Sequence, residues 1–282
     1  MKKLVQRLLL FIIGLPLTVC LVLYLPQKNH IAVNVVVILL SALGAIEFAD
    51  MLGKKEPLLP RREAAILGSM APIAMTLMVS FGFSGQSASV TLVLGAVWLL
   101  VSRIFSTDHS ETAIRRISSG FAVMIYPGIF MAWIIRMSLF PRSDMMILMF
   151  LLIIIANDST AWAVGMLFGK GNRGIIKASP NKSVAGFIGG FAASTLVGIG
   201  AVYFAPETFP PGMLPAPLPG IILGFISGLA GTLGDLGESV MKRSSNVKDS
   251  GTIIPGRGGI LDTIDSIALA APVFYILYWI LF

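Results

Sequence analysis

The sequence predicts an all-α, polytopic integral membrane protein with about nine transmembrane helices, its N-terminus in the cytoplasm and its C-terminus outside. Three observations support this fold class. The 282 residues are 56% hydrophobic and only 12% charged, whereas soluble domains carry about 25% charged residues. Apolar runs of about 20 residues, the length that crosses a bilayer, recur along the chain. The basic residues are distributed unequally between the connecting segments, which sets the orientation.

Nine apolar runs qualify as membrane spans. The first follows a basic N-terminus and is similar to a signal peptide, but its apolar run is long and no small-residue cleavage site follows it, so we expect an uncleaved helix. Pro127 interrupts the fifth run, and the eighth is short and rich in glycine. The predicted spans are 8–25, 31–51, 64–82, 87–106, 117–136, 144–168, 184–205, 218–236 and 264–282.

The orientation follows from the Lys and Arg residues. With nine spans, 18 of the 21 basic residues lie on the same side as the N-terminus, and only Lys28, Arg136 and Arg142 lie on the other. Cytoplasmic segments carry such an excess of positive charge, so the N-terminal side is predicted to be cytoplasmic. The net charge of +7 is then explained by loops that face anionic lipid, and we expect no nucleic-acid partner.

One polar segment, from Gly234 to Asp265, stands between apolar runs. It contains five carboxylates, four basic residues and six glycines. The carboxylates are Asp235, Glu238, Asp249, Asp262 and Asp265, and the basic residues are Lys242, Arg243, Lys248 and Arg257. Such a concentration of polar groups is predicted to be a functional site.

Acidic residues within apolar runs require an explanation, because inserting each one into the membrane costs about 2.5 kcal/mol or more. We expect Asp158 and Asp235 to belong to a site rather than to form ion pairs with basic residues on neighbouring helices. Glu47 and Asp50 lie near the inner end of the second span, and for them we expect an interfacial pairing with Lys54 or Lys55. The recurring Gly220, Gly224 and Gly228, four residues apart, predict close helix packing.

The residue types restrict the chemistry of the site. Cys20 is the single cysteine and His30 and His109 are the only histidines, which excludes disulfides and any metal site built on Cys or His clusters. Carboxylates would instead hold a hard cation, Mg²⁺ with room for a second cation. Lys, Arg and the glycine-rich turn at 255–259 suit phosphate groups. No P-loop motif is present, so we expect another kind of phosphoryl or nucleotidyl site.

Two blocks of the sequence are similar to phosphatidate cytidylyltransferases, also called CDP-diacylglycerol synthases. The first block is Asn157-Asp158, then Gly165, Phe168-Gly169-Lys170, Ser179-Pro180-Asn181-Lys182-Ser183 and Gly189-Gly190. The second runs from Gly234-Asp235 through Ser239, Lys242-Arg243, Lys248-Asp249 and Pro255-Gly256-Arg257-Gly258-Gly259 to Asp262 and Asp265. The resemblance covers about 110 residues, from Asn157 to Phe274. The chain has Arg257 where the family has His, and Thr263 where the family has Arg.

The resemblance implies transfer of CMP from CTP to phosphatidic acid, giving CDP-diacylglycerol and pyrophosphate. It divides the chain into N-terminal helices (1–140) and a catalytic region (141–282) with cytoplasmic loops at 169–183 and 237–263. It implies a homodimer in a lipid bilayer, the bacterial inner membrane, with the active site facing the cytoplasm. The implied metal ligands are Asp235, Asp262 and Asp265, and the implied catalytic residues are these three with Asp249 and Lys242. The implied substrate-binding residues are Arg243, Lys248, Arg257, Asn157, Asp158, Ser179 and Lys182.

Three other functions stay open at this stage. The first is a CTP-dependent cytidylyltransferase or kinase for a different lipid, since Arg257 and Thr263 depart from the family pattern. The second is a non-catalytic relative that keeps the scaffold. The third is a transporter, because buried acids also mark ion pathways, but it is disfavoured because the acids gather at one membrane face.

Overall fold

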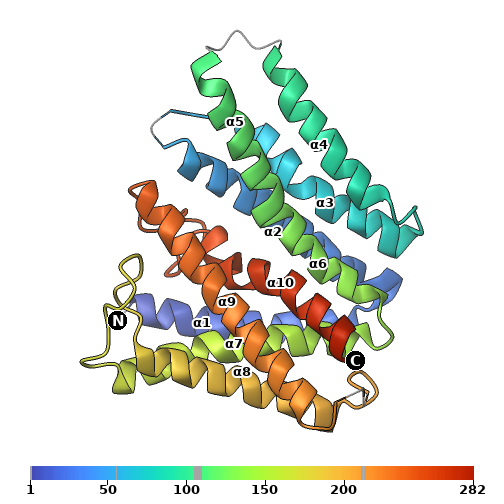
Figure 1. Cartoon of the computed structure of the whole chain (residues 1–282), viewed down its shortest axis with the longest axis vertical. Coiled ribbons are helices and arrows are strands. Elements are labelled where there is room, and N and C mark those ends of the chain that lie inside the picture. The colour runs from blue at the N-terminus through green and yellow to red at the C-terminus, as the bar shows by residue number, and fades with distance from the viewer. Residues whose placement is uncertain (1, 55, 105–109, 211, 213) are drawn as a thin grey trace. The chain divides into compact units, whose positions relative to one another are not determined.

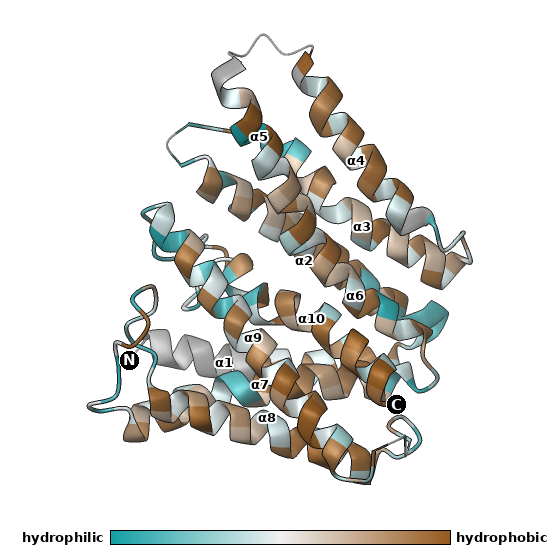
Figure 2. Ribbon diagram, in the orientation of Figure 1, coloured by the Kyte–Doolittle hydropathy of each residue, from teal (hydrophilic) through white to brown (hydrophobic). Residues whose placement is uncertain are grey.

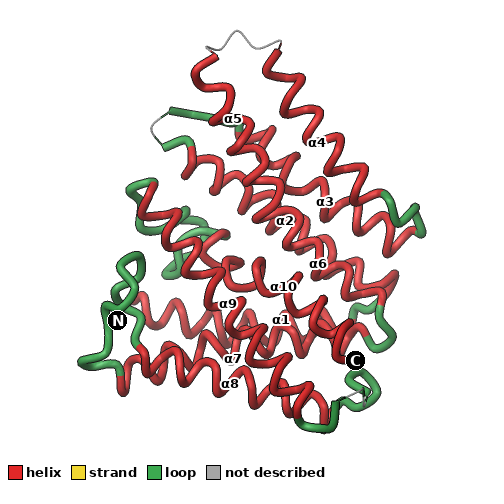
Figure 3. Tube along the Cα trace, in the orientation of Figure 1, coloured by secondary structure: helices red, strands yellow, loops and turns green. Residues whose placement is uncertain are grey.

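The computed structural model describes residues 2–54, 56–104, 110–210, 212 and 214–282. Throughout these residues the chain forms helices joined by turns and loops, and no β-strand is present among them (Figure 3). Except in their end turns, helices pair their backbone hydrogen-bonding groups within one segment, which a lipid environment requires. The prediction of an all-α fold is confirmed.

The chain divides into two compact units. Unit 1 comprises Met1–Leu139 with Ser245–Ile264, and unit 2 comprises Phe140–Ser244 with Asp265–Phe282. The prediction divided the chain at residue 140 and placed the whole of 237–263 with the C-terminal half. In the structure, residues 245–264 group with the N-terminal helices in unit 1.

The elements are labelled in Figure 1. Those of unit 1 are α1 (Lys2–Tyr24), α2 (Gln27–Leu52), α3 (Arg61–Phe81), α4 (Ser87–Ile104), α5 (Ser110–Val123), the π-helix η1 (Met124–Ile129), α6 (Phe130–Arg136) and the 3₁₀-helix η2 (Met137–Leu139). Those of unit 2 are α7 (Ser143–Phe168), α8 (Val184–Phe204), α9 (Leu218–Ser244) and most of α10 (Leu261–Leu281).

In the part of the chain that the structure describes, seven helical segments are long and apolar enough to cross a membrane. They are Gln27–Leu52, Arg61–Phe81, Thr112–Leu139, Ser143–Phe168, Val184–Phe204, Leu218–Ser244 and Leu261–Leu281. The first and fourth predicted spans are also helical, as α1 and α4, with shorter described apolar stretches at Ile12–Tyr24 and Ser89–Ser102. Hydrophobic colours dominate the helices in Figure 2, and hydrophilic colours gather at the C-terminal end of α9 and in the loop after it.

Close backbone approach holds the middle of unit 1 together. A Cβ added to Gly68 on α3 would collide with Ala45 of α2, and one on Gly128 would lie 2.8 Å from the Gly68 carbonyl oxygen. Gly128 follows Pro127 inside η1. Because proline has no N–H to donate, the fifth predicted span widens here into a turn of π-helix and then continues, rather than ending.

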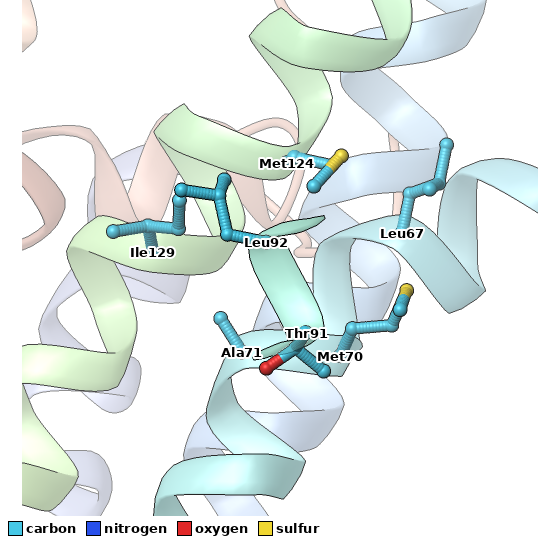
Figure 4. A pocket seen from close by; sticks show the side chains of 7 residues that line it. All are labelled: Leu67, Met70, Ala71, Thr91, Leu92, Met124 and Ile129. Carbon is cyan, nitrogen blue, oxygen red and sulfur yellow. The ribbon is translucent and has the colours of Figure 1, made fainter. Parts of the chain in front are cut away.

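Unit 1 also contains a small apolar pocket at α3, α4 and η1 (Figure 4). Its volume of about 10 Å³ is close to that of a single water molecule. Of the side chains that line it, only that of Thr91 is polar. The pocket has no titratable group and is therefore not a candidate for the chemistry predicted above.

In unit 2, α8 packs between α7 and α9. A Cβ on Gly198 of α8 would collide with the Gly220 carbonyl oxygen of α9, and one on Gly224 would collide with the Ser194 carbonyl oxygen of α8. The glycines four residues apart therefore let the two backbones touch, which confirms the predicted role of this repeat. This packing fixes α9, the helix that carries several candidate site residues.

The eighth predicted span is longer than expected. The prediction ended it at residue 236 and began a loop at 237, but α9 continues to Ser244. Glu238 and Lys242 form an ion pair one helical turn apart, and Lys242 and Arg243 in the last turn complement the negative end of the helix dipole. The polar residues there stabilise the helix rather than ending it, and the connecting loop spans 245–260.

Candidate active site

A cluster of charged side chains lies in unit 2. Its members are Asp158 on α7, Lys182 immediately before α8, Asp235 on α9 and Asp265 on α10. Lys182 Nζ lies 2.6 Å from Asp235 Oδ2, and the two side chains keep 23% and 32% of their exposure. The pair is thus sheltered but still reachable from outside. Four of the predicted site residues are brought together here, and Asp235 forms an ion pair with a basic residue beside a neighbouring helix, which was not expected for it.

Local sequence features place both members of this pair. Ser183 caps α8, its Oγ accepting a hydrogen bond of 3.1 Å from the Gly186 N–H, which fixes Lys182 at the start of the helix. On α9, a Cβ at Gly234 would collide with the Asp265 carbonyl oxygen. Glycine at 234 therefore lets α9 approach α10 beside Asp235.

Asp265 and Asp158 share one serine. The buried Asp265 carboxylate accepts hydrogen bonds from the Ser266 N–H at 2.6 Å and the Ser266 hydroxyl at 3.3 Å. The Ser266 side chain also interacts with the Asp158 carboxylate. Asp235 lies near enough to repel both carboxylates, and Lys182 attracts Asp158. Three neighbouring carboxylates with one lysine leave an excess of negative charge, which favours binding of a cation.

Asn157 lies beside this cluster and is almost fully buried. Its Nδ2 donates to Thr232 Oγ1 at 3.0 Å and to Asp158 Oδ1 at 3.4 Å. Its Oδ1 is buried without a hydrogen-bond partner in the described structure. Asn157 therefore orients Asp158 and still has an acceptor available.

The basic residues at the end of α9 have different environments. Lys242 is buried and paired with the fully buried Glu238, so its ammonium points into the unit. Arg243 is exposed, and its Nε donates to the Ala178 carbonyl oxygen at 3.3 Å. Arg243 thereby ties α9 to the 169–183 loop, where the half-buried Ser179 accepts a backbone hydrogen bond of 3.2 Å from Lys182.

The remaining predicted residues belong to the 245–260 loop and the start of α10, in unit 1. Lys248, Asp249 and Arg257 are exposed on this loop. Asp262 Oδ2 accepts three hydrogen bonds, from the Gly259 N–H at 2.8 Å, the Ser250 N–H at 2.8 Å and the Ser250 hydroxyl at 2.9 Å. Asp262 therefore organises the loop through one of its two oxygens.

Glycines give this loop its shape. Gly256 and Gly258 adopt φ angles of 80° and 117°, which favour glycine because a side chain would be strained there. The Ile254 N–H donates to the Gly258 carbonyl oxygen at 2.8 Å and closes the turn. Arg257 stands at the tip of this turn and is exposed.

Glu47 was interpreted differently from the sequence. The expected pairing with Lys54 or Lys55 is not what the structure records: Glu47 Oε2 accepts hydrogen bonds from the Ser250 hydroxyl and the Leu261 N–H. Lys55 lies outside the described residues. Asp50 pairs with Arg61 at 3.0 Å. An acid in an otherwise apolar helix was the available signal, but its partner lies 203 residues away along the chain.

The donor atoms suit a hard cation. No three His, Cys, Asp or Glu side chains are arranged to enclose a metal ion within the described part of the chain. Mg²⁺ at nucleotide sites, however, is commonly held by one or two carboxylates, with substrate phosphates supplying further oxygens. Asp235 and Asp265 of unit 2 fit that requirement. The third predicted ligand, Asp262, belongs to unit 1, and its Oδ2 is hydrogen-bonded within the loop, as Asp235 Oδ2 is paired with Lys182 and Asp265 Oδ1 is bonded to Ser266.

The fold is that of a membrane protein, and unit 2 carries a cluster of three carboxylates and one lysine. Comparison with known families identifies the protein family. Residues 5–281 match the model of the cytidylyltransferase family. The chain belongs to this family, and the match includes both sequence blocks described above.

Individual relatives agree with this family. The chain is 28% identical over 246 residues to the phosphatidate cytidylyltransferase of Pseudomonas aeruginosa, covering 84% of each chain. It is 37% identical over 136 residues to the enzyme of that name from Synechocystis sp., covering 48% of this chain and 44% of the relative. It is 41% identical over 126 residues to that of Staphylococcus aureus, covering 45% and 46%. The stronger identity is thus confined to about half of the chain.

Proposed function

We propose that this protein is a phosphatidate cytidylyltransferase, which transfers CMP from CTP to phosphatidic acid and releases pyrophosphate. The observation that carries the proposal is the family match over residues 5–281. The cluster of Asp158, Lys182, Asp235 and Asp265 supplies the kind of groups that such a reaction needs.

The reaction is a displacement at phosphorus. An oxygen of the phosphatidic acid phosphate attacks the α-phosphorus of CTP, a new P–O bond forms, and the bond to the β-phosphate breaks. The attacking oxygen is already anionic, so the reaction needs no strong base. The principal difficulty is the repulsion between two phosphate groups, which cations and positively charged side chains reduce.

Specific residues have specific roles in this proposal. Asp235 and Asp265 would hold Mg²⁺, with Asp158 next to them. Lys182 gives its charge to a substrate phosphate, and Asn157 keeps Asp158 oriented by the hydrogen bond at 3.4 Å. Bound Mg²⁺ would supply neutralising charge at the phosphate oxygens. The basic residues Arg243, Lys248 and Arg257 attract the triphosphate or the departing pyrophosphate.

The membrane arrangement extends the same proposal. We infer that α1 and α4 also cross the bilayer, giving nine spans with the N-terminus in the cytoplasm and the C-terminus outside. The support is the charge asymmetry, with 18 of 21 basic residues on one side. The active site then faces the cytoplasm, where CTP is found, in the inner membrane of a bacterium. We also propose that the protein functions as a homodimer.

A purified preparation tests this function directly. The protein in detergent micelles containing phosphatidic acid should, with CTP and Mg²⁺, form CDP-diacylglycerol and pyrophosphate in equal amounts. The Asp235→Asn variant, purified in parallel, controls for enzyme carried over from the expression host. Absence of pyrophosphate release with phosphatidic acid and with every other phospholipid tried would refute the proposal.

A panel of lipids tests the choice of acceptor. Arg257 and Thr263 replace the His and Arg of the family pattern, and the Thr263 hydroxyl donates to the Gly259 carbonyl oxygen at 3.2 Å. Thr263 therefore brings no charge to the start of α10. Transfer to another lipid phosphate, with none to phosphatidic acid, would replace the proposed substrate while keeping the cytidylyltransferase chemistry.

A further inference from the structure

Glu47 is a buried acid without a basic partner. It lies on α2, only 6% of its surface is exposed, and no ion pair involves it in the described part of the chain. Its Oε1 is buried and has no hydrogen-bond partner among the described residues. Insertion of such a group into an apolar helix is costly, so its environment must compensate.

The hydrogen bonds of the Glu47 carboxylate go to the loop that follows α9 and to the first residue of α10. Glu47 Oε2 accepts a hydrogen bond of 3.0 Å from the Ser250 hydroxyl and one of 2.9 Å from the Leu261 N–H. Leu261 is the first residue of α10, where backbone N–H groups have no partner within the helix and a negative charge is favourable. One carboxylate oxygen thus holds the beginning and the end of the segment 251–260.

The loop backbone is shaped to receive this carboxylate. A Cβ added to Gly251 would collide with Glu47 Oε1, and one added to Gly259 would collide with Glu47 Oε2. The Ser250 hydroxyl lies between the Glu47 and Asp262 carboxylates, 3.0 Å from the first and 2.9 Å from the second. Glycine at these two positions is therefore explained by the need to enclose Glu47.

We propose that Glu47 is a positioning residue for CMP transfer, which holds the 245–260 loop to α2 so that Lys248, Asp249 and Arg257 are presented in one geometry to the nucleotide phosphates. This inference rests on the proposed function. Glu47 is not proposed to touch a substrate. It acts through the loop, because its carboxylate lies on a packed helix and binds the residues at both ends of the segment 251–260.

Kinetics of Glu47→Ala and Glu47→Gln test the role. We expect Glu47→Ala to raise the KM for CTP and to lower kcat, each by about tenfold or more, because small displacements of phosphate-binding groups are costly in rate. The KM for phosphatidic acid should stay unchanged. Glu47→Gln keeps one acceptor oxygen and should lose less. Asp50→Asn is the matched control: this acid lies on the same helix, is exposed and pairs with Arg61, so its removal should leave all three constants unchanged.

Two further measurements report on the loop directly and do not require that a variant be catalytically active. Trypsin cleavage after Lys248 and Arg257, followed by mass spectrometry, should be about tenfold faster in Glu47→Ala, because cleavage reports how often the loop opens. Ser250→Ala, which removes the hydroxyl between the two carboxylates, should accelerate the same cleavages. In a double-mutant cycle, Gly251→Ala should add little to Glu47→Ala, because every atom that the added methyl would meet belongs to the Glu47 side chain.

The possible results of these experiments distinguish a positioning role of Glu47 from a general loss of folded protein. Wild-type kinetic constants and wild-type cleavage rates in Glu47→Ala would overturn the inference. A lower kcat with both KM values and the cleavage rates unchanged would also overturn it, because that pattern reflects only a smaller folded fraction. A wild-type protein that transfers no CMP would instead refute the proposed function, and the cleavage rates would still decide whether Glu47 holds the loop.

Discussion

Replacing Asp235 with asparagine should remove activity while leaving stability nearly unchanged. The Asp235 carboxylate lies 2.6 Å from Lys182 Nζ, with both side chains mostly sheltered. A charge-assisted hydrogen bond of this kind contributes about 1.5–3 kcal/mol. Asp235 is also repelled by Asp158 and Asp265, and relief of each repulsion returns on the order of 1 kcal/mol. The two effects oppose each other, so the free energy of unfolding should change by about 1 kcal/mol or less.

The effect on catalysis has no such compensation. Asparagine is nearly the same size but brings neither the charge that holds a cation nor the charge that orients Lys182. We expect kcat to fall by about 10³-fold or more, equivalent to about 4 kcal/mol of transition-state stabilisation. Pyrophosphate release measures the rate, and thermal unfolding in detergent measures the stability of the same preparation.

A matched control exists within unit 2. Glu207 pairs with Arg142 at 2.5 Å, but the two side chains are 74% and 45% exposed, and exposed pairs contribute about 0–1 kcal/mol. Glu207→Gln also removes an acid from an ion pair, and it should preserve both rate and stability. Activity of Asp235→Asn within tenfold of the wild-type rate would refute the assignment of Asp235 to the reaction.

Three further predictions concern packing, topology and metal. Gly224→Ala should destabilise the protein by about 1–3 kcal/mol, because its methyl group meets the Ser194 backbone of α8. Gly237→Ala lies on the same helix but faces open space, so it should stabilise the protein by about 0.5–1 kcal/mol. Thermal unfolding compares the two variants, and equal effects would contradict the packing of α8 against α9. A C-terminal alkaline phosphatase fusion should be active and a C-terminal fluorescent-protein fusion dark, and the reverse result would contradict an outside C-terminus. Chelation with EDTA should stop pyrophosphate release and added Mg²⁺ should restore it, and undiminished release in EDTA would exclude the metal role.

The sequence predicted the helices well because their signal is local. Among the described residues every predicted span overlaps a helical segment, since an apolar run of sufficient length has few alternatives in lipid. The end of α9 was placed too early because hydropathy falls where charged residues begin. Glu238 and Lys242 pair one turn apart and extend the helix to Ser244, and a hydropathy argument does not detect that pairing.

The structure brings four of the predicted site residues together, but their contacts could not be predicted from the sequence. Residue types alone indicated that Asp235 and Asp158 belong together, and the structure places both in one cluster with Lys182. The partners of Glu47 were missed because they depend on a contact between residues 203 positions apart. The metal-binding role of Asp262 stays a prediction, and the hydrogen bonds that its Oδ2 accepts from the loop could not be inferred from the spacing of the acids.

The proposed transfer of CMP is tested most directly by following where each phosphate of CTP goes. The purified protein is incubated with Mg²⁺ and phosphatidic acid, and with CTP labelled with ³²P in either the α-phosphate or the γ-phosphate. We expect the α-label to enter the lipid fraction and the γ-label to leave as pyrophosphate. Entry of the γ-label into lipid would show a CTP-dependent kinase, and label in neither lipid fraction would show that the protein is not an enzyme acting on CTP and phosphatidic acid.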